Sequence, residues 1–177
     1  MNSIFLIFIG ALATGLLQTV IGILDRRREA ESILTAIASE VNAICRLIRT
    51  QEYKETVGAI CSQIDSGTWD GRTVIIEVRQ NYFAVFESLS SKIGLLEASD
   101  VNQIVHFYAY CRSAIDSTRP DGIMAGDVSA DERISQLRHL FLVFDAILSL
   151  GDVISKKPRQ DISAEPILKA QPPHVSR

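Results

Sequence analysis

Histidines and cysteines are the residues of this chain that could most directly support catalysis or bind a metal. They are His106, His139 and His174, and Cys45, Cys61 and Cys111. A nucleophilic Cys needs a His within hydrogen-bond reach, and zinc ligands recur at short spacings such as HExxH or CxxC. Neither pattern occurs, and His106 and Cys111 are five residues apart, so they occupy different faces of a helix. The sequence predicts no catalytic residue, no metal site and no cofactor, with His106 partly buried and structural and the cysteines as buried thiols.

Acidic residues are frequent between residues 116 and 132, where calcium binding is the chemistry to test. An EF-hand places oxygen ligands at alternate positions around a central Gly and ends on a Glu. Only isolated parts of that pattern appear here, and no glycine-rich loop followed by Lys and Ser or Thr could hold a phosphate. We expect a solvated loop, and an enzyme is the least favoured class of function.

The N-terminal 24 residues carry the strongest signal in the chain. Ser3 to Leu24 is a run of 22 residues without a charge, and 13 of them are Ile, Leu, Phe or Val. As a helix this run would be about 33 Å long, which is enough to cross a hydrocarbon core of about 30 Å. We therefore predict that residues 1–24 form a transmembrane anchor.

Basic residues determine the expected orientation of this anchor. No Lys or Arg precedes the run, whereas Arg26, Arg27 and Arg28 follow it, and positive residues beside a span stay in the cytoplasm. We expect a single-pass protein of the inner (plasma) membrane, with a short N-terminus outside and the C-terminal domain in the cytoplasm. Two alternatives stay open: a signal peptide cleaved after Ala13, and an uncleaved anchor with an exported body.

Small residues recur at helical spacing within the predicted anchor. Ala11, Gly15 and Thr19 are four residues apart, Gly22 follows three residues later, and Gln18 lies beside them. Small side chains allow two membrane helices to approach closely, and an amide can hydrogen-bond across the pair. These residues are candidates for packing between membrane helices, with a homo-oligomer as one consequence.

Residues 25–155 are expected to form an antiparallel bundle of about four helices, so that the fold class is all-α. Apolar residues recur at steps of three and four from Ala30 to Ile48, and the stripe resumes out of phase up to Ile64. If it is continuous, this first helix is about 60 Å long. Turn-forming residues from Asp65 to Gly71 then end it and place Trp69 at a loop tip.

The next two helices are less sharply defined. Apolar spacing favours a helix from about Thr73 or later, although the β-branched residues of Thr73 to Val78 are also compatible with a strand. Gly94 is expected to end this helix as a C′ glycine, and Ser99 or Asp100 to cap the following one.

The last helix has the clearest start signal. After a loop over residues 116–128, Ser129 and Glu132 have the spacing of a capping box. The helix should continue to about Ser155. Residues 156–177 contain four Pro and scattered polar residues, and we expect a disordered tail.

Charge is distributed unevenly along the chain. Glu29 to Ser155 contains 10 Lys plus Arg and 18 Asp plus Glu, a net charge of −8. An acidic body argues against nucleic-acid binding, which needs a positive surface. The basic candidates for contact with anionic lipid headgroups are Arg26, Arg27, Arg28, Lys156, Lys157 and Arg159.

Two short motifs within Tyr82 to Cys111 carry a resemblance to known proteins. They are Ile93 to Leu96 (Ile-Gly-Leu-Leu) and Ile104 to Tyr108 (Ile-Val-His-Phe-Tyr). Together with the N-terminal span, they make the chain resemble a family of uncharacterised bacterial single-span, membrane-anchored helical proteins. The resemblance implies a bacterial membrane-tethered helical module, and it supplies no catalytic residue.

These observations predict a non-catalytic, membrane-tethered cytoplasmic module that acts as a scaffold or accessory subunit. Its partners would be the lipid bilayer, an unidentified membrane or cytoplasmic protein, or a second copy. Trp69 is the candidate partner contact because Trp is enriched at interface hot spots, and the alternative is that it folds back onto the bundle. The alternative function is an extracytoplasmic, sensor-like bundle on a signal anchor.

Overall fold

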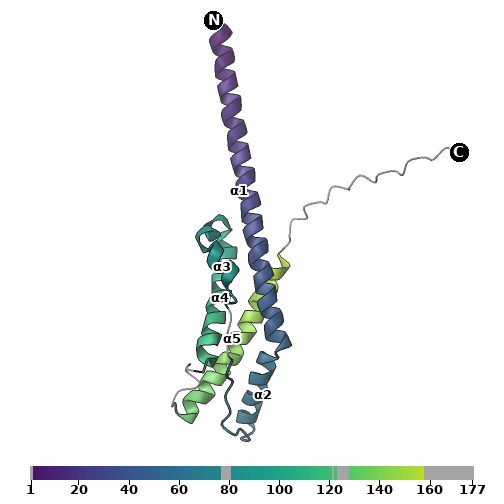
Figure 1. Cartoon of the computed structure of the whole chain (residues 1–177), viewed down its shortest axis with the longest axis vertical. Coiled ribbons are helices and arrows are strands. Elements are labelled where there is room, and N and C mark those ends of the chain that lie inside the picture. Colours follow the sequence, from purple (N-terminus) through teal and green to yellow (C-terminus); the bar gives the residue numbers. More distant parts are fainter. Residues whose placement is uncertain (1, 77–80, 121, 123–127, 158–177) are drawn as a thin grey trace, which may run out of the picture.

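All regular elements in the described residues are helices. The structure is a computed structural model, and it describes residues 2–76, 81–120, 122 and 128–157, with the side chains of residues 2–13 outside the description. The elements are α1 (Asn2–Thr50), α2 (Tyr53–Asp65), α3 (Ala84–Leu89), the 3-10 helix η1 (Ser90–Leu95), α4 (Ala98–Thr118) and α5 (Ala130–Lys156). The predicted all-α class is confirmed. Figure 1 shows that the N-terminal half of α1 projects beyond the other helices.

Helix α5 is the central element of the bundle. It packs against α4 and against α1 and α2, while α3 and η1 pack on α1. Three ion pairs show that α5 runs antiparallel to α1 and α2, because residues progressively later in α1 and α2 pair with residues progressively earlier in α5. They join Arg49 to Asp152 at 2.7 Å, Lys54 to Asp145 at 2.5 Å, and Asp65 to Arg138 at 2.7 Å. Since most of these side chains are largely exposed, the pairs mark the register and contribute little stability.

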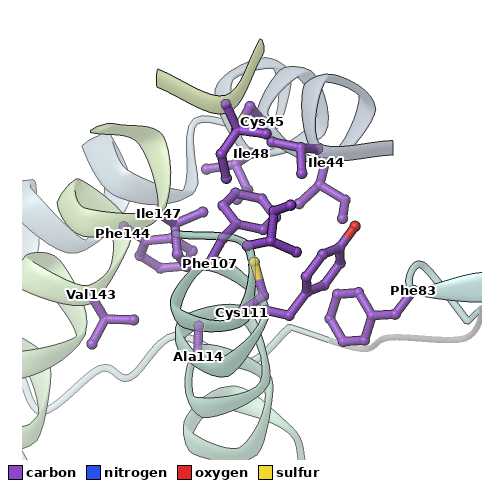
Figure 2. Packing of buried hydrophobic residues seen from close by; sticks show 14 of the residues in the cluster. Ile44, Cys45, Ile48, Phe83, Phe107, Cys111, Ala114, Val143, Phe144 and Ile147 are labelled. Atoms are coloured by element: carbon purple, nitrogen blue, oxygen red, sulfur yellow. The ribbon is translucent and has the colours of Figure 1, made fainter. Parts of the chain in front are cut away.

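The hydrophobic core lies where α1, α4 and α5 converge. Figure 2 shows Ile44, Cys45 and Ile48 of α1, Phe107, Cys111 and Ala114 of α4, and Val143, Phe144 and Ile147 of α5 gathered around this point. Phe83, from the segment before α3, closes the cluster from the side. The apolar stripes read in the sequence therefore face one another as expected for a helical bundle.

The first helix of the body is broken at Glu52 and does not continue to Ile64. Glu52 has φ 51° and ψ 35°, the left-handed conformation, and α2 begins at the next residue. This break has a sequence signal, because the apolar stripe changes phase after Thr50. Turning the chain here lets Val57 of α2 reach the core that the α1 stripe faces.

Glu52→Gly is expected to raise the free energy of unfolding by about 1 kcal/mol, because the left-handed conformation strains a residue with a Cβ but not glycine. Urea denaturation of the full-length protein followed by circular dichroism measures this change. Gln51→Gly is the matched control. Gln51 still donates its backbone N–H to Leu47 O at 3.0 Å, so glycine there should lower the stability. A loss of stability in Glu52→Gly would contradict the strain at this break.

The middle helix starts later than Thr73, at Ala84, and the role predicted for Gly94 is wrong. Residues 73–76 are neither helix nor strand, and they are held to α4 by the N–H of Ile76, which donates to Thr118 O at 2.9 Å. Residues 77 and 78 lie outside the described residues. Gly94 does not end a helix but lies inside η1, and Leu96, which follows η1, is extended (φ −81°, ψ 164°). An extended exit needs no left-handed residue, so it does not need a C′ glycine.

Of the N-caps predicted for α4 and α5, only the one at α5 is present. Helix α4 begins after Glu97, and no side chain caps it. Asp100 lies in its first turn and forms an ion pair with Lys157 instead of a cap. At α5 the capping box is confirmed, since Ser129 Oγ accepts from Glu132 N at 3.3 Å and the Glu132 carboxylate accepts from Ser129 N at 3.0 Å.

The structure describes only part of the predicted anchor and of the predicted tail. No helix in the portion of the chain that was described is long and apolar enough to cross a membrane. The run Ser3 to Leu24 extends into residues 2–13, whose side chains are outside that portion. The tail assigned to residues 156–177 begins one residue early, because Lys156 ends α5, and residues 158–177 are outside the description.

Candidate functional site

The described part of the predicted anchor is an apolar helical segment that is exposed along its whole length. Every residue from 14 to 24 is exposed. Its large aliphatic side chains are between 48% and 61% exposed, and they are Leu16, Leu17, Val20, Ile21, Ile23 and Leu24. Soluble monomers rarely expose contiguous apolar patches of this kind, so the segment is a candidate contact surface.

The small residues of the anchor lie on the same exposed segment. A Cβ added at Gly15 or at Gly22 would meet no atom within 4 Å. The Thr19 hydroxyl donates to Gly15 O at 2.9 Å within the same helix, while Gln18 is exposed. Ala11 has its side chain outside the described residues. The predicted packing face is therefore open in a single chain from Gly15 to Gly22.

The basic residues fall into two groups near one end of the bundle. Arg26, Arg27 and Arg28 are exposed on α1 directly after the aliphatic segment. Lys156 is also exposed, whereas Lys157 is largely buried in its ion pair with Asp100. This pair holds the end of α5 against the start of α4. Arg159 lies outside the described residues.

A polar cluster around Glu40 joins three helices inside the bundle, and no local pattern in the sequence indicates it. The Glu40 carboxylate accepts from Val85 N at 2.7 Å, from Phe86 N at 3.1 Å and from Tyr108 Oη at 2.6 Å. Val85 and Phe86 are in the first turn of α3, whose preceding residue, Phe83, makes no side-chain cap. A carboxylate of α1 thus satisfies free N–H groups at the start of α3, as a capping residue would.

Aromatic rings enclose the third partner of this cluster. Tyr108 is 2% exposed, and its ring stacks on Phe86 at a centroid distance of 4.0 Å and meets Phe83 edge-on at 5.5 Å. Burial, together with the hydrogen bond to Glu40, raises the pKa of the Tyr108 hydroxyl well above its usual range. Tyr108 therefore stays a protonated donor, and the cluster is a fixed structural connection between α1, α3 and α4.

A cavity of about 80 Å³ lies beside this region, between α1, α4 and α5. Ile48, Cys111 and Phe144 are among the residues that line it, and Thr118 supplies a hydroxyl that is already bonded to Ala114 O at 2.8 Å. Ligand pockets for drug-sized molecules measure roughly 300 to 1,000 Å³. This cavity has room for a few atoms and is best described as imperfect packing.

The structure places the histidines apart from any cluster of ligands. His106 and His139 are exposed, and His174 lies outside the described residues. The expectation that His106 is partly buried is wrong, because it faces solvent on α4 while Cys111 points into the core. No group of three or more His, Cys, Asp or Glu among the described residues could hold a metal ion.

All three cysteines are free thiols, and two of them are buried as predicted. Cys45 and Cys111 are buried, and Cys61 is half-buried. Burial raises the pKa of the Cys45 thiol from 9.0 to about 11. Burial also raises the pKa of Cys111, and that of Cys61 is raised by burial and then by nearby Asp65. The reactive thiolate is therefore scarce at each site.

Iodoacetamide at mildly alkaline pH is expected to modify Cys61 first, because only its side chain has access to solvent. Cys45 and Cys111 should react only when urea unfolds the bundle. Peptide mass spectrometry of timed samples measures the order, and Cys61→Ser should remove the fast reaction without changing the other two. Equal rates at all three thiols in the absence of urea would show that the core is open.

Trp69 folds back onto the bundle instead of extending from the loop tip. It is half-buried and packs against the hydrophobic core. Its indole Nε1–H donates to Arg72 O at 3.0 Å, so the polar edge of the ring is satisfied within its own loop. Only the exposed part of the ring is available for the partner contact that the sequence suggested.

The best candidate for a functional surface is therefore the exposed aliphatic segment of α1, together with the Arg triplet after it. Comparisons of this chain with protein-family models, with curated proteins and with solved structures find no match. Its function has to be inferred from its own residues, and the surface that requires an explanation is the apolar one.

Proposed function

We propose that the chain is a membrane-tethered helical module whose N-terminal helix enters a bilayer and whose bundle lies in the cytoplasm. The observation that carries the proposal is the exposure of six large aliphatic side chains between Leu16 and Leu24. In water these groups cost free energy, whereas each contributes favourably to insertion, by about 0.3 to 0.6 kcal/mol on an insertion scale. The uncharged sequence from Ser3 to Leu24 extends the same surface toward the N-terminus.

The Arg triplet supports the orientation. Arg26, Arg27 and Arg28 are exposed directly after the aliphatic segment, where they can meet anionic headgroups, at about 1 kcal/mol each. Their position on the bundle side of the segment favours a cytoplasmic bundle in the inner membrane. The bundle then acts by binding another protein as a scaffold or accessory subunit.

Membrane fractionation after alkaline carbonate extraction tests the tether. The full-length protein should stay in the membrane pellet, and the double variant Leu16→Arg, Leu17→Arg should move to the supernatant, because each Arg costs about 2.5 to 3.5 kcal/mol in a membrane helix. Leu142→Arg is the matched control, since Leu142 on α5 is 63% exposed against 61% for Leu16 and Leu17. Release of the unaltered protein by carbonate would overturn the proposal.

Reporter fusions at the C-terminus test the orientation separately. A reporter that is active only in the cytoplasm should be active here, and a reporter that needs export should not. The opposite result would place the bundle outside and favour the sensor-like alternative. Purification in mild detergent, with chemical cross-linking before lysis, would then identify the protein partner on the correct side of the membrane.

A further inference from the structure

The 3-10 helix η1 lies against α1 just beyond the Arg triplet. Lys92 Nζ is 2.6 Å from Glu29 Oε1, so η1 lies beside the residue that follows Arg28. Ile93 and Leu96 are half-buried and pack against the core, whereas Gly94 and Leu95 are exposed. Leu95 is 40% exposed, so part of an aliphatic side chain faces solvent in the stretch from Lys92 to Leu95, the η1 corner.

The corner is also at the end of the bundle from which the apolar segment emerges. Figure 1 shows that the turn between α3 and α4 lies nearer to the N-terminus of α1 than the opposite end of α4 does. The ion pair between Asp100 and Lys157 places the start of α4 and the end of α5 at this same end. A membrane that holds the N-terminal half of α1 would therefore face η1 directly.

The distance of the η1 corner from the hydrocarbon core follows from its position along α1. Glu29 is five residues beyond Leu24, a rise of about 8 Å at 1.5 Å per residue. Headgroups occupy about 5 to 8 Å on each side of the hydrocarbon core. A salt bridge at Glu29 thus holds Lys92 at the outer boundary of the headgroup layer, and a helix tilt of about 20° toward this side would bring Leu95 into it.

The charges at this end of the bundle suit an anionic surface. Two of the acids are already paired, Glu29 with Lys92 and Asp100 with Lys157. Among the described residues, the cations left are Arg26, Arg27, Arg28 and Lys156, and the acids left are Asp25, Glu31 and Glu97. Cations therefore exceed acids here, although the body as a whole is acidic.

We propose that the η1 corner, Lys92 to Leu95, is a second contact with the bilayer, made to the anionic headgroup surface beside the point where α1 enters. Leu95 inserts between headgroups, and Lys92 is shared between Glu29 and a lipid phosphate. The proposal rests on the membrane tether and adds a fixed rotation of the bundle about α1. One face of the bundle is then always turned away from the lipid, where a protein partner can reach it.

Tryptophan scanning of the full-length protein in vesicles tests this contact. Single Trp residues are introduced as Leu95→Trp, Leu17→Trp and Leu142→Trp, each in a Trp69→Phe background and checked for native circular dichroism. The vesicles contain phosphatidylcholine and phosphatidylglycerol, with bromine placed either near the headgroup or deep in the acyl chain. Fluorescence of Leu95→Trp should shift to the blue and be quenched by shallow bromine, and Leu17→Trp should be quenched by deep bromine.

The Leu142 position is the control for non-specific contact. Leu142 is exposed on α5 and 14 residues before Lys156, about 21 Å along the helix from the membrane-facing end, so its Trp should be quenched by neither lipid. Quenching at Leu17 without quenching at Leu95 would overturn the second contact and leave the tether standing. No quenching at Leu17 would overturn the tether itself. Quenching at Leu142 equal to that at Leu95 would show that the bundle meets the membrane without a preferred face.

Discussion

Gly151→Ala is expected to lower the free energy of unfolding by about 2 kcal/mol, even though alanine is the better helix former. Gly151 is buried in α5 where this helix crosses α1, and a Cβ there would lie 2.2 Å from Cys45 Sγ and 3.3 Å from Phe107 Cε2. Overpacking a core costs about 1 to 3 kcal/mol, and an approach of 2.2 Å places Gly151→Ala at the upper end of this range, so that about 2 kcal/mol remains after a gain of about 1 kcal/mol from helix propensity. Urea denaturation monitored by circular dichroism measures the difference.

Two further variants isolate the cause. In a Cys45→Ala background the sulfur is absent, so Gly151→Ala should become neutral or stabilising, with a coupling energy of about 1 to 3 kcal/mol between the two sites. Gly58→Ala is the matched control in α2, since its Cβ would meet only the ring edge of Phe141 at 3.1 Å. A loss that is unchanged by Cys45→Ala would mean that the close approach of α1 and α5 is not what requires the glycine.

The parts of the fold that the sequence predicted are those with a local signal. The capping box at Ser129 and Glu132 is contained in four residues, and the apolar stripe of α5 continues without a break to the end of the helix. The phase change after Thr50 was visible too, but the stripe alone does not say whether a helix bends or breaks there. The break depends on Glu52 accepting a left-handed conformation, which is uncommon for a residue other than glycine.

The failures share a different cause, because tertiary contacts override the local preference. Residues 73–76 have helical spacing, yet the N–H of Ile76 is taken by Thr118 O of α4. Asp100 is a good capping residue, yet Lys157 from the far end of α5 binds its carboxylate. Neither partner is near in sequence, so no reading of a local window could have placed these contacts.

The candidate site also contains features that the local sequence predicts and features that it does not. The aliphatic run and the Arg triplet are contiguous in sequence and could be recognised before the structure was known. The Glu40 cluster could not, because its partners are at least 45 residues away. Glu40 falls off the apolar stripe that contains Val41, so helical spacing alone predicted a solvent-exposed side chain.

Glu40→Ala is expected to lower the free energy of unfolding by about 3 kcal/mol and to release the start of α3 first. The substitution leaves the N–H groups of Val85 and Phe86 and the hydroxyl of Tyr108 without their acceptor, and each half-buried donor left unpaired costs about 1 kcal/mol or more. Denaturation measures the total, and hydrogen exchange at the amides of Val85 and Phe86 should accelerate before that of α5.

Tyr108→Phe distinguishes the contribution of the hydroxyl to stability from that of the two backbone N–H groups. It removes one donor and keeps the stacked ring, so it should cost about 1 kcal/mol and leave exchange at Val85 nearly unchanged. Glu31→Ala, at an exposed position on the same helix, should cost less than about 0.5 kcal/mol. If Glu40→Ala cost no more than Glu31→Ala, the carboxylate would not be holding α3. A large loss of stability with slow exchange at Val85 would instead assign the effect of Glu40→Ala to its bond with Tyr108, because the N–H groups at the start of α3 would then stay protected without the carboxylate.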